Sequence, residues 1–110
     1  PVISFGEYGH RGSMRNLLGD DPSEDLMRSL SNETQVMPDT PPAFLWHTAD
    51  DAGVPVQNSL LFAEALSANQ VPYELHIYPS GRHGLGLAEE FPHIASWMDL
   101  LAVWLREAGF

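Results

Sequence analysis

Apolar residues in this chain gather into short continuous runs, separated by stretches in which they recur at helical spacing. Residues 43–47 are a continuous apolar run after a proline, which is typical of a buried β-strand. Residues 73–78 also follow a proline and predict a strand, in which Tyr73, Leu75 and Ile77 alternate with Glu74, His76 and Tyr78. Residues 2–5 form another short apolar run that Gly6 ends, and they predict a first strand. Residues 38–42 hold three prolines, so we expect an extended segment there.

Helical spacing is clearest in the second half of the chain. Residues 56–69 place leucines and alanines on one face, and Pro72 follows shortly after this pattern. A last helix is predicted from apolar residues at steps of three and four, and Gly109 stops it. Its apolar face consists of Ile94, Trp97, Met98, Leu101, Trp104 and Leu105.

The N-terminal part of the chain predicts less regular structure. Residues 6–20 hold four glycines and are expected to be an irregular loop, after which Asp21 as N-cap and Pro22 predict a short helix. The elements then alternate between strand and helix, which indicates an α/β fold with three parallel strands and flanking helices. Its first strand would be a bare hydrophobic edge, so we expect the C-terminal part of a larger α/β protein.

Composition removes several classes of function. Fifteen acidic residues stand against five arginines and no lysine, for a formal net charge of −10 over 110 residues. We therefore expect neither nucleic acid nor a membrane surface as a partner. The chain has no cysteine, which excludes a disulfide framework, a thiolate nucleophile and a zinc–thiolate site. None of these features fixes the cellular compartment.

Residues that can carry chemistry follow two of the predicted strands. Asp50 and Asp51 come after the strand at 43–47, and His83 comes after the strand at 73–78, among glycines. Because the carboxyl ends of parallel strands meet at one edge of a sheet, an acidic pair and a histidine are predicted to lie together. An aspartate that orients a histidine base makes up two parts of a nucleophilic triad.

These two loops carry a resemblance to a known superfamily. Residues 51–55, D-A-G-V-P, resemble the D-x-x-V-P acid turn of α/β-hydrolases, and residues 80–84, S-G-R-H-G, resemble their histidine loop. Further segments are similar to bacterial esterases of the esterase/lipase branch, often called acetyl-xylan or acetyl esterases. These segments are H-R-G-S at 10–13, N-L-L-G at 16–19, L-S-N-E at 30–33, P-P-A-F-L-W-H at 41–47 and H-G-L-G-L at 83–87.

The resemblance implies the C-terminal portion of an α/β-hydrolase fold and a carboxylic ester hydrolase with no metal or organic cofactor. Asp51 would be the triad acid and His83 the general base, acting with a serine on a small-molecule or carbohydrate ester. The family order is serine, acid, histidine, but the chain contains no G-x-S-x-G. We therefore interpret residues 1–110 as a partial domain without the nucleophile half, and expect it to be inactive alone.

Several side chains have more than one interpretation. Asp50 competes with Asp51 for the role of triad acid, and either carboxylate could instead cap the turn. His10, in the glycine-rich loop, is a candidate for lining a substrate pocket. His47 ends a predicted buried strand and is interpreted as a hydrogen-bonded core or rim residue. The five histidines show no ligand spacing that predicts a metal site.

Two other functions stay open on the sequence. A non-catalytic module could self-associate, or bind a partner, through an exposed strand at residues 1–5. A peptidase or lipase of the same superfamily is the other possibility, because acid and histidine loops are common to all these enzymes.

Overall fold

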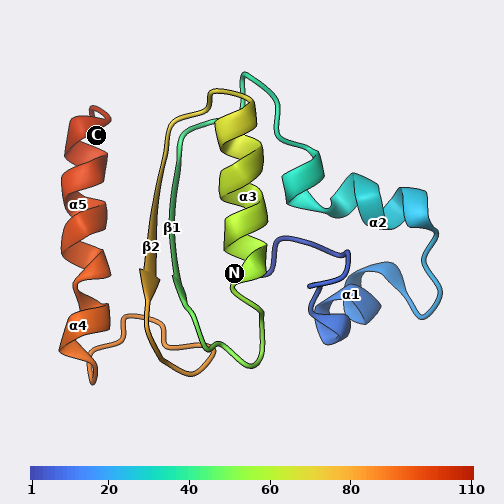
Figure 1. Ribbon diagram of the computed structural model, residues 1–110, viewed down its shortest axis with the longest axis horizontal. Coiled ribbons are helices and arrows are strands. Elements are labelled where there is room, and N and C mark those ends of the chain that lie inside the picture. Colours follow the sequence, from blue (N-terminus) through green and yellow to red (C-terminus); the bar gives the residue numbers. More distant parts are fainter.

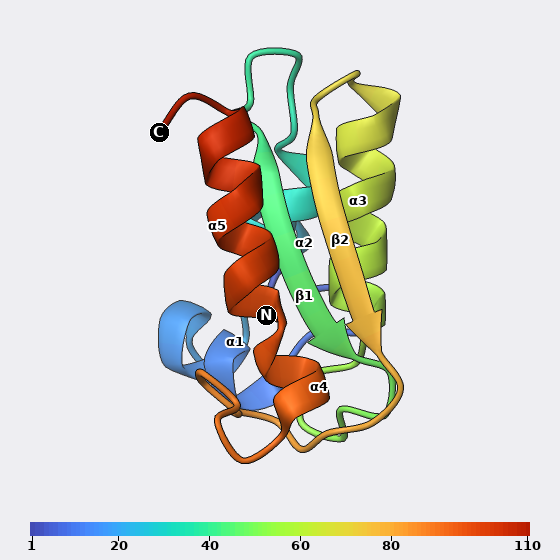
Figure 2. The same ribbon diagram turned by 90° about the vertical axis from the view of Figure 1, so that its left-hand side faces the viewer.

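A computed structural model describes residues 1–110 and places a parallel two-stranded sheet between helical layers. β1 (Ala43–Thr48) and β2 (Tyr73–Tyr78) pair in register along their whole length. α3 (Gln57–Ala68) connects the strands and lies on one face of the sheet, and α5 (Trp97–Glu107) lies on the other (Figures 1 and 2). Both strands therefore end at the same edge, as the alternation of elements predicts.

The face of the sheet under α5 is packed with aromatic side chains. Tyr78, Ala88 and Ile94 form a buried cluster, against which partly buried Trp46 and Trp97 pack. The rings of Trp46 and Trp97 stack, with centroids 5.5 Å apart. Burial of rings of this size is a large apolar contribution to stability, so this cluster fixes α5 against β1.

The predicted last helix is present, but Ser96 interrupts it. α4 (Pro92–Ala95) precedes Ser96 and α5 follows it. The Ser96 hydroxyl donates to the carbonyl of His93 at 2.6 Å and lies 3.1 Å from the hydroxyl of Tyr78. Gly109, with a φ of 91°, ends α5 as expected.

The prediction of a first strand at residues 2–5 is wrong. The segment is buried at Ile3, Ser4 and Phe5, but the sheet contains β1 and β2 alone. Side chains take the place of a neighbouring strand. Asn58 Oδ1 accepts from the N–H groups of Ile3 and Ser4, and Ser31 Oγ accepts from that of Phe5. The bare strand edge that suggested self-association is therefore absent, and self-association stays a prediction without structural support.

The prediction of a loop over residues 6–20 is also wrong, because α1 (Arg11–Leu18) lies within it. The ring Nδ1 of His10 accepts from the backbone N–H of Ser13 and caps the helix. Gly19, at a φ of 87°, follows the last helical residue. Three of the four glycines of the segment thus lie outside the helix, where they do not weaken it.

The next helix begins slightly later than predicted. α2 (Glu24–Leu30) has Ser23 as its N-cap, whose hydroxyl accepts from the N–H of Leu26 at 3.2 Å. Glu24 and Asp25 in its first turn suit the positive end of the helix dipole. A short 3₁₀ turn, η1 (Asn32–Thr34), follows and packs against α3. None of the helices has the length and apolar character needed to cross a membrane.

Candidate active site

Asp51 lies in the turn that follows β1, and the turn itself fixes its carboxylate. Oδ1 accepts from the backbone N–H groups of Gly53 and Val54, each at 2.8 Å. The side chain is 7% exposed. The D-x-x-V pattern is therefore a turn closed by its own aspartate, and Oδ2 remains free to face the histidine loop.

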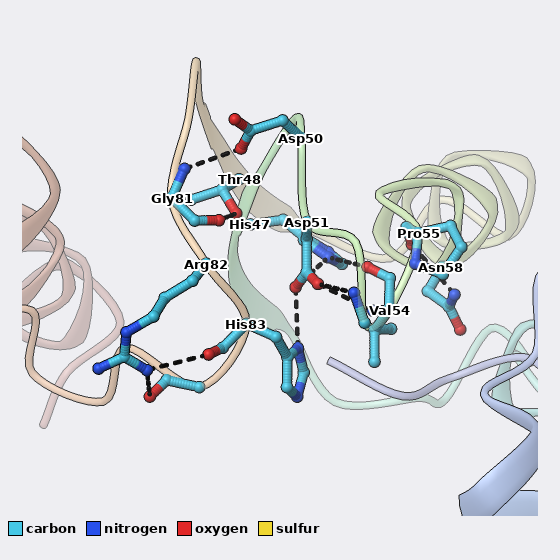
Figure 3. Close-up of polar contacts among 12 residues, drawn as sticks. His47, Thr48, Asp50, Asp51, Val54, Pro55, Asn58, Gly81, Arg82 and His83 are labelled. Atoms are coloured by element: carbon cyan, nitrogen blue, oxygen red, sulfur yellow. Dashed lines mark hydrogen bonds and ion pairs between the residues drawn. The ribbon is translucent and has the colours of Figure 1, made fainter.

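His83 meets that second oxygen. Its Nδ1 lies 2.9 Å from Asp51 Oδ2, across 32 positions of sequence (Figure 3). Because a carboxylate accepts hydrogen bonds, Nδ1 is assigned the proton and Nε2 is left with its lone pair. Half of the His83 side chain is exposed, and Nε2 has no hydrogen-bond partner in the chain. The structure thus brings together the two residues that the sequence singled out, in the geometry of an acid and an oriented base.

Local hydrogen bonds keep Asp51 ionised. Burial raises the pKa of its carboxyl, but hydrogen bonds from Val54, the His83 ring and Gly53 favour the charged form more strongly. The net result is a pKa below the ordinary value of 3.8. Asp51 is therefore a carboxylate at neutral pH and can stabilise a positive charge on the His83 ring.

Asp50 has a different partner. Its Oδ1 accepts from the backbone N–H of Gly81 at 2.8 Å, and the hydroxyl of Thr48 donates to the carbonyl of Gly81 at 2.7 Å. The backbone N–H and the carbonyl of Gly81 are thus both bound by residues at or just after the end of β1. These contacts join the acid turn to the histidine loop two residues before His83, and no hydrogen bond links Asp50 to the His83 ring.

The backbone of the histidine loop is compact around the ring. Arg82 Nη1 donates to the carbonyls of His83 and Gly84, both at 3.2 Å. Gly84 has a φ of 74°, a conformation that side chains disfavour. A Cβ on Gly53 would lie 3.0 Å from the His83 Cβ, so the acid turn needs glycine where the ring approaches it.

His47 is a buried histidine directly behind the acid turn. It is 3% exposed, with Nε2 2.9 Å from the carbonyl oxygen of Val54 and Nδ1 2.8 Å from the hydroxyl of Ser59. Burial lowers the pKa of His47 below its ordinary value of 6.5, more than the hydrogen bond to Val54 raises it. His47 is a hydrogen-bonded core or rim residue, as expected. Its Nε2 also lies 3.5 Å from Asp51 Oδ2, a contact that no local sequence pattern predicts.

His10 does not join this group. Its Nδ1 caps α1 and lies 2.9 Å from the Ser13 hydroxyl, and no hydrogen bond connects it to Asp51 or His83. A role in substrate binding stays a prediction. Nowhere in the chain do three or more histidine, aspartate or glutamate side chains gather as metal ligands would.

Comparison with known proteins places this chain in a family. The model of the prolyl oligopeptidase family matches residues 6–108. An acetyl ester-xyloside bifunctional hydrolase from Caldicellulosiruptor lactoaceticus superposes with a TM-score of 0.98 at 52% identity, over 100% of this chain and 40% of that one.

Two curated proteins are also similar to this chain in sequence. Endo-1,4-beta-xylanase B of Butyrivibrio fibrisolvens is 44% identical over 82% of this chain and 14% of its own length. An acetylxylan esterase of Xylanibacter ruminicola is 34% identical over 96% of this chain and 23% of its own length. The chain thus spans less than a quarter of either curated relative. With its parallel strands, acid turn and histidine loop, it belongs to the prolyl oligopeptidase family and is part of an α/β-hydrolase fold.

Proposed function

We propose that this chain supplies the acid and the base of a serine-dependent carboxylic ester hydrolase. The observation that carries the proposal is the bond between His83 Nδ1 and the buried Asp51 carboxylate, with Nε2 unbonded and the ring half exposed. A base of this kind needs one nitrogen held by an acid and the other open to a nucleophile. Both conditions are met at the edge of the sheet where the strands end.

The mechanism requires a serine, which would come from residues outside this chain because the chain has no G-x-S-x-G. As the serine oxygen bonds to the ester carbonyl carbon, its proton passes to His83 Nε2. Asp51 stays ionised and stabilises the imidazolium. That imidazolium protonates the leaving alcohol when the tetrahedral intermediate collapses. His83 next takes a proton from water as the water oxygen attacks the acyl-enzyme. When this second tetrahedral intermediate collapses, the bond to the serine oxygen breaks, His83 returns the proton to that oxygen, and the acid is released.

An acetyl ester on a carbohydrate is the substrate class that we propose. The names of two relatives mention acetyl esters together with xylan or a xyloside. Their similarity extends over at least 96% of this chain, so it includes both loops described above. Asp51 and His83 would act only on the ester group itself. Because an acetylated sugar and a simpler acetyl ester share this group, a simple ester can be used to test these residues.

A peptidase is the second candidate, and the name of the matching family favours it. Ester and amide hydrolysis use the same triad but differ in the leaving group that the imidazolium must protonate. Matched substrates with one acyl group, as a p-nitrophenyl ester and as a p-nitroanilide, separate the two. We expect turnover of the ester; preferential turnover of the anilide would replace the esterase proposal by a peptidase.

The direct test uses the complete hydrolase, by which we mean this chain together with the nucleophile-bearing half. His83→Ala should lower kcat/KM for p-nitrophenyl acetate by about 10² to 10⁴. His76→Ala is the matched control, because His76 pairs with Glu74 on β2, away from the dyad. Acetate release from acetylated xylan then tests the substrate class. Activity of His83→Ala equal to that of the control would overturn the proposal.

A further inference from the structure

We propose that His47 is a positioning residue for the proposed triad, holding the Asp51 turn in the orientation that His83 requires. The inference rests on the proposed function, since it assigns His47 a role in a reaction. Its support is separate: a continuous set of contacts runs from α3, through His47, to the carboxylate that binds His83. No step of the proposed mechanism uses His47 itself.

The first contact fixes the histidine to the helix behind it. Ser59, in the first turn of α3, is fully buried, and its Oγ lies 2.8 Å from His47 Nδ1. The other ring nitrogen, Nε2, lies 2.9 Å from the carbonyl of Val54, which can only accept. Nε2 therefore carries the proton, and Nδ1 of the neutral ring accepts from the Ser59 hydroxyl. The Val54 carbonyl thus selects the tautomer, and Ser59 anchors the ring to α3.

The second contact reaches the acid turn at two points. Nε2 donates to the carbonyl of Val54 and lies 3.5 Å from Asp51 Oδ2, the same oxygen that binds His83 (Figure 3). The N–H of Val54 meanwhile donates to Asp51 Oδ1. His47 therefore braces one side of the turn while the backbone of the turn holds the carboxylate from the other. Rotation of the carboxylate away from His83 would require these contacts to break, together with the bond from the Gly53 N–H to Oδ1.

The protonation state of His47 suits this role. A neutral N–H next to Oδ2 presents a partial positive charge, and it leaves the full carboxylate charge available to the His83 ring. Buried hydrogen-bonded groups of this kind define one arrangement of a site more sharply than apolar contacts do. A small displacement of the acid is costly in catalysis, because about 1 Å of misplacement lowers a rate by about a hundredfold.

Two amide variants separate positioning from simple burial. In His47→Gln the amide nitrogen takes the place of Nε2 and can still donate to Val54, whereas in His47→Asn the amide reaches Ser59 alone. Both are polar and uncharged. In the complete hydrolase we expect kcat for p-nitrophenyl acetate to fall by about ten- to a hundredfold in His47→Asn, with KM little changed. His47→Gln should recover most of the loss.

A spectroscopic measurement checks the geometry without turnover. With ¹⁵N-labelled histidine, the Nδ1 proton of His83 should exchange faster with solvent in His47→Asn than in the unmodified protein and in His47→Gln. His76→Gln is the control for removal of a histidine elsewhere. A folded His47→Asn variant with unchanged kcat and unchanged exchange of this proton would overturn the proposal, as would equal losses in the Gln and Asn variants.

A third variant keeps the test decisive if His47→Asn does not fold. Ser59→Ala keeps His47 but removes the hydrogen bond that anchors its ring to α3. We expect a smaller fall in kcat and a smaller increase in the exchange rate of the His83 Nδ1 proton than in His47→Asn. If both quantities are unchanged in Ser59→Ala, the proposal is overturned. Failure of the proposed function has a different signature, because a fully active His83→Ala variant would reject the triad without altering the exchange measurements on His47 variants.

Discussion

Asp50 and Asp51 are adjacent along the chain, but their carboxylates bind different parts of the histidine loop. Asp51 Oδ2 binds the ring of His83 at 2.9 Å, and Asp50 Oδ1 accepts from the backbone of Gly81 at 2.8 Å. One aspartate orients the base and the other joins the loop that carries it. Asp50 is exposed, whereas the side chain of Asp51 is almost fully buried. These environments favour Asp51 over Asp50 as the acid of the proposed triad.

The two aspartates should therefore respond unequally to the same substitution. Asp51→Asn puts an amide where the carboxylate accepts from His83, so we expect kcat of the complete hydrolase to fall by about 10⁴ through the wrong tautomer of the base. Asp50→Asn keeps an oxygen that can accept from Gly81 and should cost far less. Ester hydrolysis under saturating substrate measures both, and a larger loss in Asp50→Asn would reverse the assignment.

A side chain at Gly81 should be costly, because it would displace three neighbouring side chains. A Cβ there would lie 2.8 Å from Leu85 Cδ1, 2.9 Å from Thr48 Cγ2 and 3.1 Å from Ile94 Cδ1. We expect Gly81→Ala to lower the free energy of unfolding by about 1–3 kcal/mol, the usual cost of overpacking.

Urea unfolding followed by tryptophan fluorescence measures this effect of Gly81→Ala. Gly6→Ala is the control, because a Cβ on Gly6 would meet only the Ser4 hydroxyl, at 3.4 Å. Equal stability of the two variants would show that the histidine loop can shift away from β1.

The sequence predicts the strands, the acid turn and the histidine loop because their signals are local. An apolar run marks β1, alternation marks β2, and the D-x-x-V turn is closed by contacts within four residues. The buried segment at residues 2–5 has the same local signal as a strand. Its N–H groups are bound by side chains of Asn58 and Ser31, which lie 55 and 26 positions away, so no local pattern distinguishes the segment from a strand.

Other features escape sequence analysis for similar reasons. The sequence does not predict α1, because its N-cap is His10 and histidine is not a residue type that marks the start of a helix. The position of His47 at the end of a buried strand was predictable, but its contacts with Ser59 and Asp51 depend on how α3 packs behind the turn. Tertiary packing therefore decides the parts of the site that lie behind the two motif loops.

Asn58 should be among the most sensitive positions for stability. It is fully buried, and besides the two N–H groups that it accepts from, its Nδ2 donates to the carbonyls of Tyr8 and Pro55. Asn58→Ala leaves several buried backbone groups without partners, each costing about 1–3 kcal/mol.

The control for this position is Asn69→Ala at the other end of α3, where the side chain makes one bond, to the carbonyl of Ala65. We expect thermal unfolding to show a far larger loss for Asn58→Ala. Similar melting temperatures for the two variants would contradict the role of Asn58 in fixing residues 3–8.

The buried histidine gives stability a defined dependence on pH. Burial lowers the pKa of His47 in the folded chain below its ordinary value of 6.5, so between these two values the unfolded chain binds more protons. The free energy of unfolding therefore decreases as the pH falls through this window. The lowered pKa of Asp51 acts in the same direction but at lower pH, below about 3.8. Acid should thus weaken the fold through both groups, with His47 acting at the higher pH of the two.

Replacement of His47 by a group that does not titrate isolates the contribution of His47. His47→Gln should flatten the decline of the unfolding free energy between pH 7 and pH 5 relative to His76→Gln, in which the buried histidine is retained. Urea unfolding at a series of pH values gives the two slopes. If they are equal, protonation of His47 does not oppose folding. Protonation would make Nδ1 a donor and require the Ser59 hydroxyl to rotate and accept, so equal slopes would mean that this exchange offsets the cost of burying the charge.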